Sequence, residues 1–194
     1  MTFRRGLRDL LAIKPEELFR RYFVNTVFDS TFVVMGILAA TALVPEANPE
    51  VAIGALFAAC LAIGVSTGVS VYEAESIESD IHIRRIERAM LSSLEHTEFR
   101  RQARATRFAT AAVNFAAPLV VAAITGMPLL LHQAGSIPSF GVAALTSGGL
   151  ALGIIFATGY YIGSLTRRPW LRAVRMSVIA LLTFVVLIII ERLA

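Results

Sequence analysis

Five long apolar segments limit what this chain can fold into more than any other feature of its sequence. Each is long enough to cross a bilayer as a helix, which takes about 20 largely apolar residues. With 56% hydrophobic and only 16% charged residues in 194, a water-soluble domain could not bury this much apolar surface. The sequence therefore predicts an all-α integral membrane protein with five transmembrane helices, at about residues 22–44, 51–72, 106–131, 137–165 and 170–190.

The positions of the basic residues predict how these spans are oriented. Of the 18 Lys and Arg residues, 17 lie before the first span or at the connections between spans two and three and between spans four and five, including the first turns of the spans that follow. The connections at 45–50 and 132–136 carry none. By the positive-inside rule, the N-terminus is cytoplasmic and the C-terminus is outside. The net charge of +4 is thus explained by orientation and by the lipid bilayer as partner, and nucleic acid is not expected as a partner.

The parts of the chain outside the spans also have helical patterns. Phe3, Leu7 and Leu10 recur at helical spacing among arginines, which is typical of an interfacial amphipathic helix. The charged segment after span two lacks Gly and Pro and has acid–base pairs four residues apart, such as Asp80 with Arg84. The predicted organisation is an interfacial helix (1–21), a hairpin of the first two spans (22–72), a short cytoplasmic helical insert (73–105) and the last three spans (106–194).

Asp29 is the acidic residue that lies well inside a predicted span. A carboxylate at membrane depth is costly, so it is a functional hypothesis by default. We expect it to face a polar cavity or a bound cation. The alternative is a structural carboxylate, paired with an arginine or capped by the hydroxyls of Thr26 and Ser30.

Two further sets of oxygen atoms are candidates for an ion path. Ser66, Ser70 and Glu73 share one helical face, and oxygen ligands suit hard or borderline cations. Alternatively, the serines bond to their own helix. In span three, Pro118 removes the backbone donor for the carbonyl of Asn114, at about the depth of Asp29. The alternative there is a simple proline kink.

A third candidate is a stripe of Glu75, Glu78 and His82 just beyond span two. Carboxylates and an imidazole on one helical face can hold a divalent transition metal, whereas the alternative is a solvated helix with salt bridges. The sequence contains no Walker loop, zincin motif or nucleophile triad, so an enzyme is not expected.

Two pairs of glycines spaced four residues apart predict close helix packing. They are Gly64 with Gly68 in span two and Gly159 with Gly163 in span four. Small residues let neighbouring helices approach closely in a membrane, and we expect a homodimer to pack through these faces.

Four segments add specific motifs to these features: FDSTF at 28–32, YEAES at 72–76, NFAAP at 114–118 and TRRPWLR at 166–172. With them, the chain resembles the vacuolar iron transporter family, particularly its shorter prokaryotic members. The chain departs from the family at Ser30, where relatives have glycine, at Ser66 and Ser70 in place of Met and Glu, and at Asn114 in place of Asp.

The resemblance implies a homodimer in a prokaryotic inner membrane that exports Fe²⁺ or Mn²⁺ from the cytoplasm in exchange for protons. The metal would be the transported substrate, with no tightly bound cofactor. Asp29 would be its ligand within the membrane, and the acidic cytoplasmic helices would gather it. The alternative function is a non-transporting membrane scaffold whose cytoplasmic helices bind a partner.

Overall fold

The computed structural model is all-helical, and it describes residues 15–42, 48–94, 97–165 and 167–193. Each of its five helices is long and apolar enough to cross a membrane, which confirms that part of the prediction. The expected interfacial helix falls largely on residues 1–14, outside the described residues. The helices are α2 (Pro15–Ala42), α3 (Pro49–Met90), α4 (Glu98–Gln133), α5 (Phe140–Ser164) and α6 (Pro169–Leu193).

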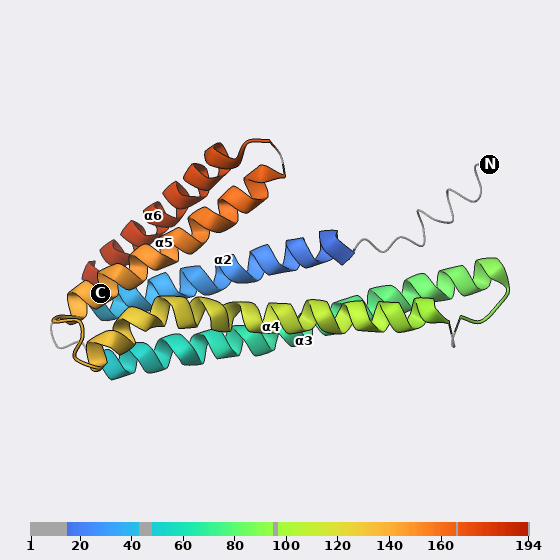
Figure 1. Ribbon diagram of the computed structural model, residues 1–194, viewed down its shortest axis with the longest axis horizontal. Coiled ribbons are helices and arrows are strands. Elements are labelled where there is room, and N and C mark those ends of the chain that lie inside the picture. Colours follow the sequence, from blue (N-terminus) through green and yellow to red (C-terminus); the bar gives the residue numbers. More distant parts are fainter. Residues whose placement is uncertain (1–14, 43–47, 95–96, 166, 194) are drawn as a thin grey trace.

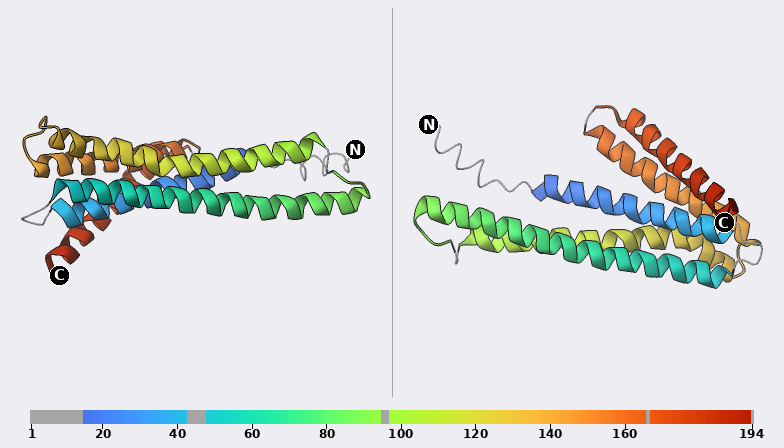
Figure 2. Two further views of the ribbon diagram at one scale, coloured as in Figure 1. Left: turned by 90° about the horizontal axis from the view of Figure 1, so that it is seen from below. Right: turned by 180° about the vertical axis from the view of Figure 1, so that it is seen from behind.

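The helix α2 occupies the centre of the arrangement and packs against all four others. On one side lie α3 and α4, which run beside each other for most of their length (Figure 1). On the other side lie α5 and α6, and this pair diverges from the rest towards its own connecting turn (Figures 1 and 2). The N-terminal half of α2 is therefore covered mainly by α3 and α4.

Two apolar clusters hold these layers together. The first joins α2 to α3, α4 and α5, with Val34, Leu56 and Leu129 fully buried in it. The second joins α2 to α5 and α6 around Met35 and Ile155. The neighbouring residues Val34 and Met35 thus face opposite layers, which is why a central helix needs apolar residues around much of its circumference.

The charged insert is built from continuations of α3 and α4, which extend without interruption beyond the uncharged parts of the chain. From Glu73 to Met90, α3 continues for about 25 Å at 1.5 Å per residue. We call this projecting hairpin, residues 73–107, the stalk (Figure 2). Its helix α3 ends at Met90, and the C-cap residue Leu91, with a left-handed φ of 51°, turns the chain back towards α4.

Candidate functional site

Asp29 lies within the apolar part of α2, and its side chain points away from the centre of the helix bundle. Its side chain is exposed, and Asn25 Nδ2 donates a hydrogen bond to its Oδ2 at 3.0 Å. Val33, one turn further on, is also exposed, at 38%. Because residues four apart share a helical face, Asn25, Asp29 and Val33 form a continuous exposed line, which we call the α2 outer stripe. Neither of the hydroxyls proposed as caps, Thr26 and Ser30, is bonded to this carboxylate; both are buried on another face.

Asn114, by contrast, is completely buried where α2, α3 and α4 meet. Its side-chain oxygen accepts from the Thr26 hydroxyl at 2.8 Å, and its Nδ2 donates to the Thr110 carbonyl at 2.8 Å. The backbone carbonyl freed by Pro118 lies 3.2 Å from the Thr67 hydroxyl, whose single proton is shared with the Ile63 carbonyl of α3 at 2.8 Å. The side-chain amide of Asn114 is therefore satisfied by protein groups. Asn114 is thus enclosed between helices, whereas Asp29 is exposed, and no contact joins the two side chains among the described residues.

The serines of span two are not part of an interior path. Ser66 and Ser70 are both exposed, and the Ser70 hydroxyl donates to the Ser66 carbonyl at 2.6 Å. This bond within one helix is the structural alternative considered for these residues. Within span two, the hydroxyl that α3 presents to α4 is that of Thr67.

The stripe of Glu75, Glu78 and His82 does not close into a metal group. Among the described residues, no three His, Cys, Asp or Glu side chains are grouped so as to hold one ion. Glu78 is exposed, and Glu75 and His82 are partly buried on α3. Asp80, expected to pair with Arg84, instead bonds to Arg107 of α4.

All four glycines lie in contacts between helices of the same chain. A Cβ on Gly64 would lie 2.7 Å from the Phe115 carbonyl oxygen, and one on Gly68 would lie 3.0 Å from the Phe115 Cβ, both on α4. A Cβ on Gly159 or Gly163 would meet the backbone at the start of α6 at 3.0 and 2.5 Å. These faces are covered within the protomer, which contradicts the expectation that a dimer packs through them.

A buried arginine at the base of the stalk ties its two helices together, and the sequence analysis did not single it out. Arg107 is only 7% exposed. Its guanidinium donates to the hydroxyls of Ser76 and Ser79, at 2.7 and 3.1 Å, and forms an ion pair with Asp80 at 2.9 Å. Three residues of α3 at helical spacing thus face one arginine of α4. The signal available in the sequence was this spacing, since i, i+3 and i+4 share a helical face.

Glu73 lies at the rim of a groove on the outer surface of α3 and α4. The groove has a volume of about 680 Å³ and is otherwise lined mainly by aliphatic and aromatic side chains. Glu73 is exposed, and it lies apart from the buried cluster around Asn114. The lining includes Val65, Val69, Tyr72, Glu73, Phe108 and Phe115.

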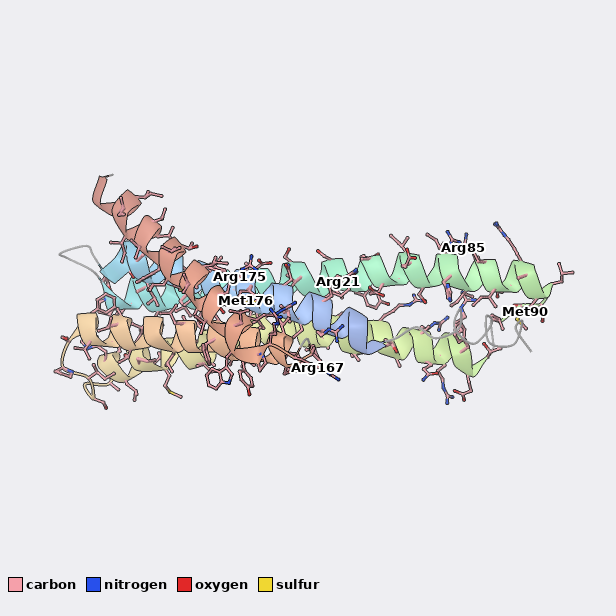
Figure 3. The ribbon with its side chains drawn as sticks, turned by 90° about the horizontal axis from the view of Figure 1, so that it is seen from above. Arg21, Arg85, Met90, Arg167, Arg175 and Met176 are labelled. Atoms are coloured by element: carbon pink, nitrogen blue, oxygen red, sulfur yellow. The ribbon has the colours of Figure 1, made fainter. Side chains whose placement is uncertain are left out.

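The basic side chains of the described residues occupy two regions along the long axis of the molecule. Arg21, Arg167 and Arg175 lie near the middle of the long axis, while Arg85 and Met90 lie far out on the stalk (Figure 3). The start of α2 and the connection between α5 and α6 therefore belong to the same side as the stalk. This agrees with the grouping of basic residues that the sequence shows.

By length and composition, the five helices define a multi-pass all-α membrane protein. Comparison with protein-family models, with curated proteins and with solved structures gives no significant match. The resemblance described above therefore rests on its four sequence segments.

Proposed function

We propose that this chain is a transporter that carries a divalent metal cation across the membrane in exchange for protons. The observation that supports it is Asp29, a carboxylate in the apolar part of α2 that no basic side chain neutralises in any contact among the described residues. A charge held at membrane depth is costly and is retained where it serves an ion or proton pathway. A carboxylate binds either a proton or a metal ion, so competition for Asp29 couples the two fluxes.

The α2 outer stripe explains how such a site would be completed. Asp29 is exposed in one protomer, and a charged group does not face lipid at this depth without a partner. Two copies meeting along this stripe would place two Asp29 carboxylates and two Asn25 amide oxygens together. Such an oxygen set suits hard or borderline divalent cations, and Fe²⁺ and Mn²⁺ are the ions that the family resemblance implies. In this proposal Asn114 has a structural role and is not an ion ligand.

The direction of transport follows from the orientation that the basic residues predict. With the stalk in the cytoplasm, the acidic residues of the stalk meet cytoplasmic metal first. Export from the cytoplasm, driven by inward proton movement, is the mode that this arrangement favours.

The test is Fe²⁺ and Mn²⁺ flux into proteoliposomes under a pH gradient. We expect Asp29→Asn to lose both metal flux and metal-driven proton movement, because the amide keeps the shape but neither binds a proton nor carries charge. Glu50→Gln is the matched control, since it removes an exposed carboxylate in the first turn of α3, at the opposite end of that helix from the stalk. Wild-type flux in Asp29→Asn would place the site elsewhere.

One observation favours the alternative function, a membrane scaffold that does not transport. The stalk projects about 25 Å beyond the uncharged part of α3, which is a large surface for a partner. Folded wild-type protein without flux of either metal, in the same liposomes, would favour the scaffold over the transporter.

A further inference from the structure

The groove between α3 and α4 is independent of the proposed ion site. It begins about 12 Å inside the uncharged part of α3, at Val65, and ends at Tyr72 and Glu73. The residues 51–72 of α3 and 108–131 of α4 carry no charge, so Glu73 and Phe108 lie where both helices leave the apolar layer. The groove thus runs along one leaflet and opens at its interface, on the side of the stalk.

The shape and chemistry of the groove match an acyl chain in its apolar part, near Val65, and a polar head group at its mouth, near Tyr72 and Glu73. Phe108 is 69% exposed and Val69 is 58% exposed, so the walls of the groove offer apolar surface to a lipid acyl chain. A volume of about 680 Å³ lies within the range of pockets that hold molecules of drug or lipid-tail size. Tyr72 at the mouth is typical of residues at the level of the head groups.

One acidic residue lies at the mouth of the groove, and one basic residue lies one helical turn beyond it on α4. Glu73 on α3 lines the groove directly. Arg104 is exposed and lies four residues before Phe108, on the same face of α4. A head group with both an ammonium and a phosphate complements this pair, the ammonium beside Glu73 and the phosphate beside Arg104. A primary ammonium offers three hydrogen-bond donors to the carboxylate, whereas a quaternary ammonium offers none.

We propose that this groove is a binding site for a phospholipid with a primary-amine, zwitterionic head group, of the phosphatidylethanolamine class. The acyl chain lies along Val65, Val69 and Phe115, and the ammonium pairs with Glu73. The site assigns Glu73 to lipid recognition, in place of the metal path that the sequence suggested.

Native mass spectrometry of the full chain tests the proposal. The protein is released from nanodiscs that contain equal amounts of phosphatidylethanolamine, phosphatidylcholine and phosphatidylglycerol with identical acyl chains. We expect wild type to retain the ethanolamine lipid over the choline lipid by about threefold to tenfold, the effect of an ion pair at an interface. Glu73→Gln is expected to remove this preference, and Glu78→Gln, on another face of α3, to keep it.

Two more variants separate the head-group contacts from the groove itself. Arg104→Gln is expected to weaken retention of the ethanolamine and choline lipids alike, since both have a phosphate, whereas Arg85→Gln, far out on the stalk, leaves it unchanged. Ala112→Phe places a large side chain at an exposed position that lines the groove, and it is expected to reduce retention of every lipid. This variant tests whether lipid binds in the groove even if Glu73→Gln does not fold. Equal retention of the ethanolamine and choline lipids by wild type, an unchanged preference in Glu73→Gln, or a preference for phosphatidylglycerol would overturn the proposal.

Discussion

Asn114 uses both ends of its amide and its own carbonyl to join three helices at one depth. Thr26 of α2 donates to its side-chain oxygen, and its amide nitrogen donates to Thr110 of its own helix. Its backbone carbonyl shares the Thr67 hydroxyl of α3 with the Ile63 carbonyl. Hydrogen bonds between helices in a membrane contribute about 0.6 kcal/mol on average and up to about 1.7 kcal/mol. The amide is therefore a structural junction that holds α2 against the α3–α4 pair.

Replacing Asn114 by alanine is expected to lower the free energy of unfolding by about 1–2 kcal/mol, because two side-chain bonds are lost and a small cavity remains. The measurement is unfolding of the purified protein in mixed micelles. Thr125→Val is the control, since the Thr125 hydroxyl is buried but bonds only within α4. In flux assays, the metal concentration for half-maximal transport should stay unchanged in Asn114→Ala; a large increase would make Asn114 an ion ligand after all.

Gly64 is the glycine whose replacement conflicts most directly with backbone in the α3–α4 contact. A methyl group there would lie 2.7 Å from the Phe115 carbonyl oxygen, and backbone cannot move aside as a flexible side chain can. We expect Gly64→Ala to destabilise the protein by about 1–3 kcal/mol, as overpacking does. Gly54→Ala in the same helix is the control, because nothing lies within 4 Å of its added methyl group. It should be neutral or stabilising by up to about 1 kcal/mol, and equal effects of the two changes would argue against close α3–α4 packing at this point.

The depth of individual residues in the membrane was predictable from the sequence, but the neighbouring helix that each side chain contacts was not. The position of Asp29 along its span and the carbonyl freed by Pro118 follow from residue counting and from the chemistry of proline. Which hydroxyl meets that carbonyl depends on how α3 and α4 rotate against each other. That rotation is set by Gly64 and Gly68 against Phe115, a contact between segments about 50 residues apart.

At the scale of helices, α3 and α4 continue past the apolar layer as one antiparallel pair. Ile83, Ile86 and Ala103 are buried along it, so the stalk has a narrow apolar seam of its own. At its tip, the Glu87 carboxylate accepts the Leu94 N–H at 2.8 Å, which fixes the turn after α3. The absence of Gly and Pro made helix predictable here, whereas the pairing of the two arms required the three-dimensional contacts.

The Arg107 network is expected to control the stability of the stalk. Asp80→Ala leaves a nearly buried guanidinium without its carboxylate and should destabilise the stalk by about 1–2 kcal/mol, discounted because Asp80 is 46% exposed. Adding Arg107→Met should recover part of the loss, since an apolar side chain of similar length carries no unmatched charge. Amide hydrogen exchange across residues 73–107 measures both effects.

An exposed ion pair in the same region provides the control. Glu98 and Arg101 are 79% and 80% exposed, so Glu98→Ala should leave the exchange rates of the stalk unchanged. If Asp80→Ala behaves like Glu98→Ala, the Arg107 pair contributes no more than an ordinary surface contact.

At the scale of the whole molecule, the orientation in the membrane is the first property to test. Cys60 is buried, so the natural chain offers little background for labelling with a membrane-impermeant thiol reagent. Ser92→Cys lies exposed at the stalk tip, and Ser136→Cys lies exposed between α4 and α5 at the other end. We expect only position 136 to react in intact cells, and position 92 to react after the membrane is opened. The reverse pattern would invert the proposed direction of transport.

The last prediction concerns the face through which two copies meet. The glycine faces are already covered within each chain, while the α2 outer stripe leaves Asp29 exposed at a depth where lipid is a poor neighbour. If two protomers pair along this stripe about a twofold axis, Val33 of one lies near Val33 of the other, one turn from Asp29. Val33→Cys is therefore expected to form a disulfide-linked dimer under mild oxidation in the membrane.

Leu182→Cys is the matched control for this cross-link. Leu182 is 60% exposed on α6, whereas the stripe lies on α2. The Leu182→Cys protein should therefore remain monomeric under the same oxidation. Without added metal, the double variant Val33→Cys, Asp29→Asn is expected to cross-link more efficiently than Val33→Cys alone. The reason is that two facing Asp29 carboxylates repel each other until a proton or a cation lies between them. Added Mn²⁺ should abolish this difference. Equal cross-linking at positions 33 and 182 would show random collision, and the site would then have to be completed within a single protomer.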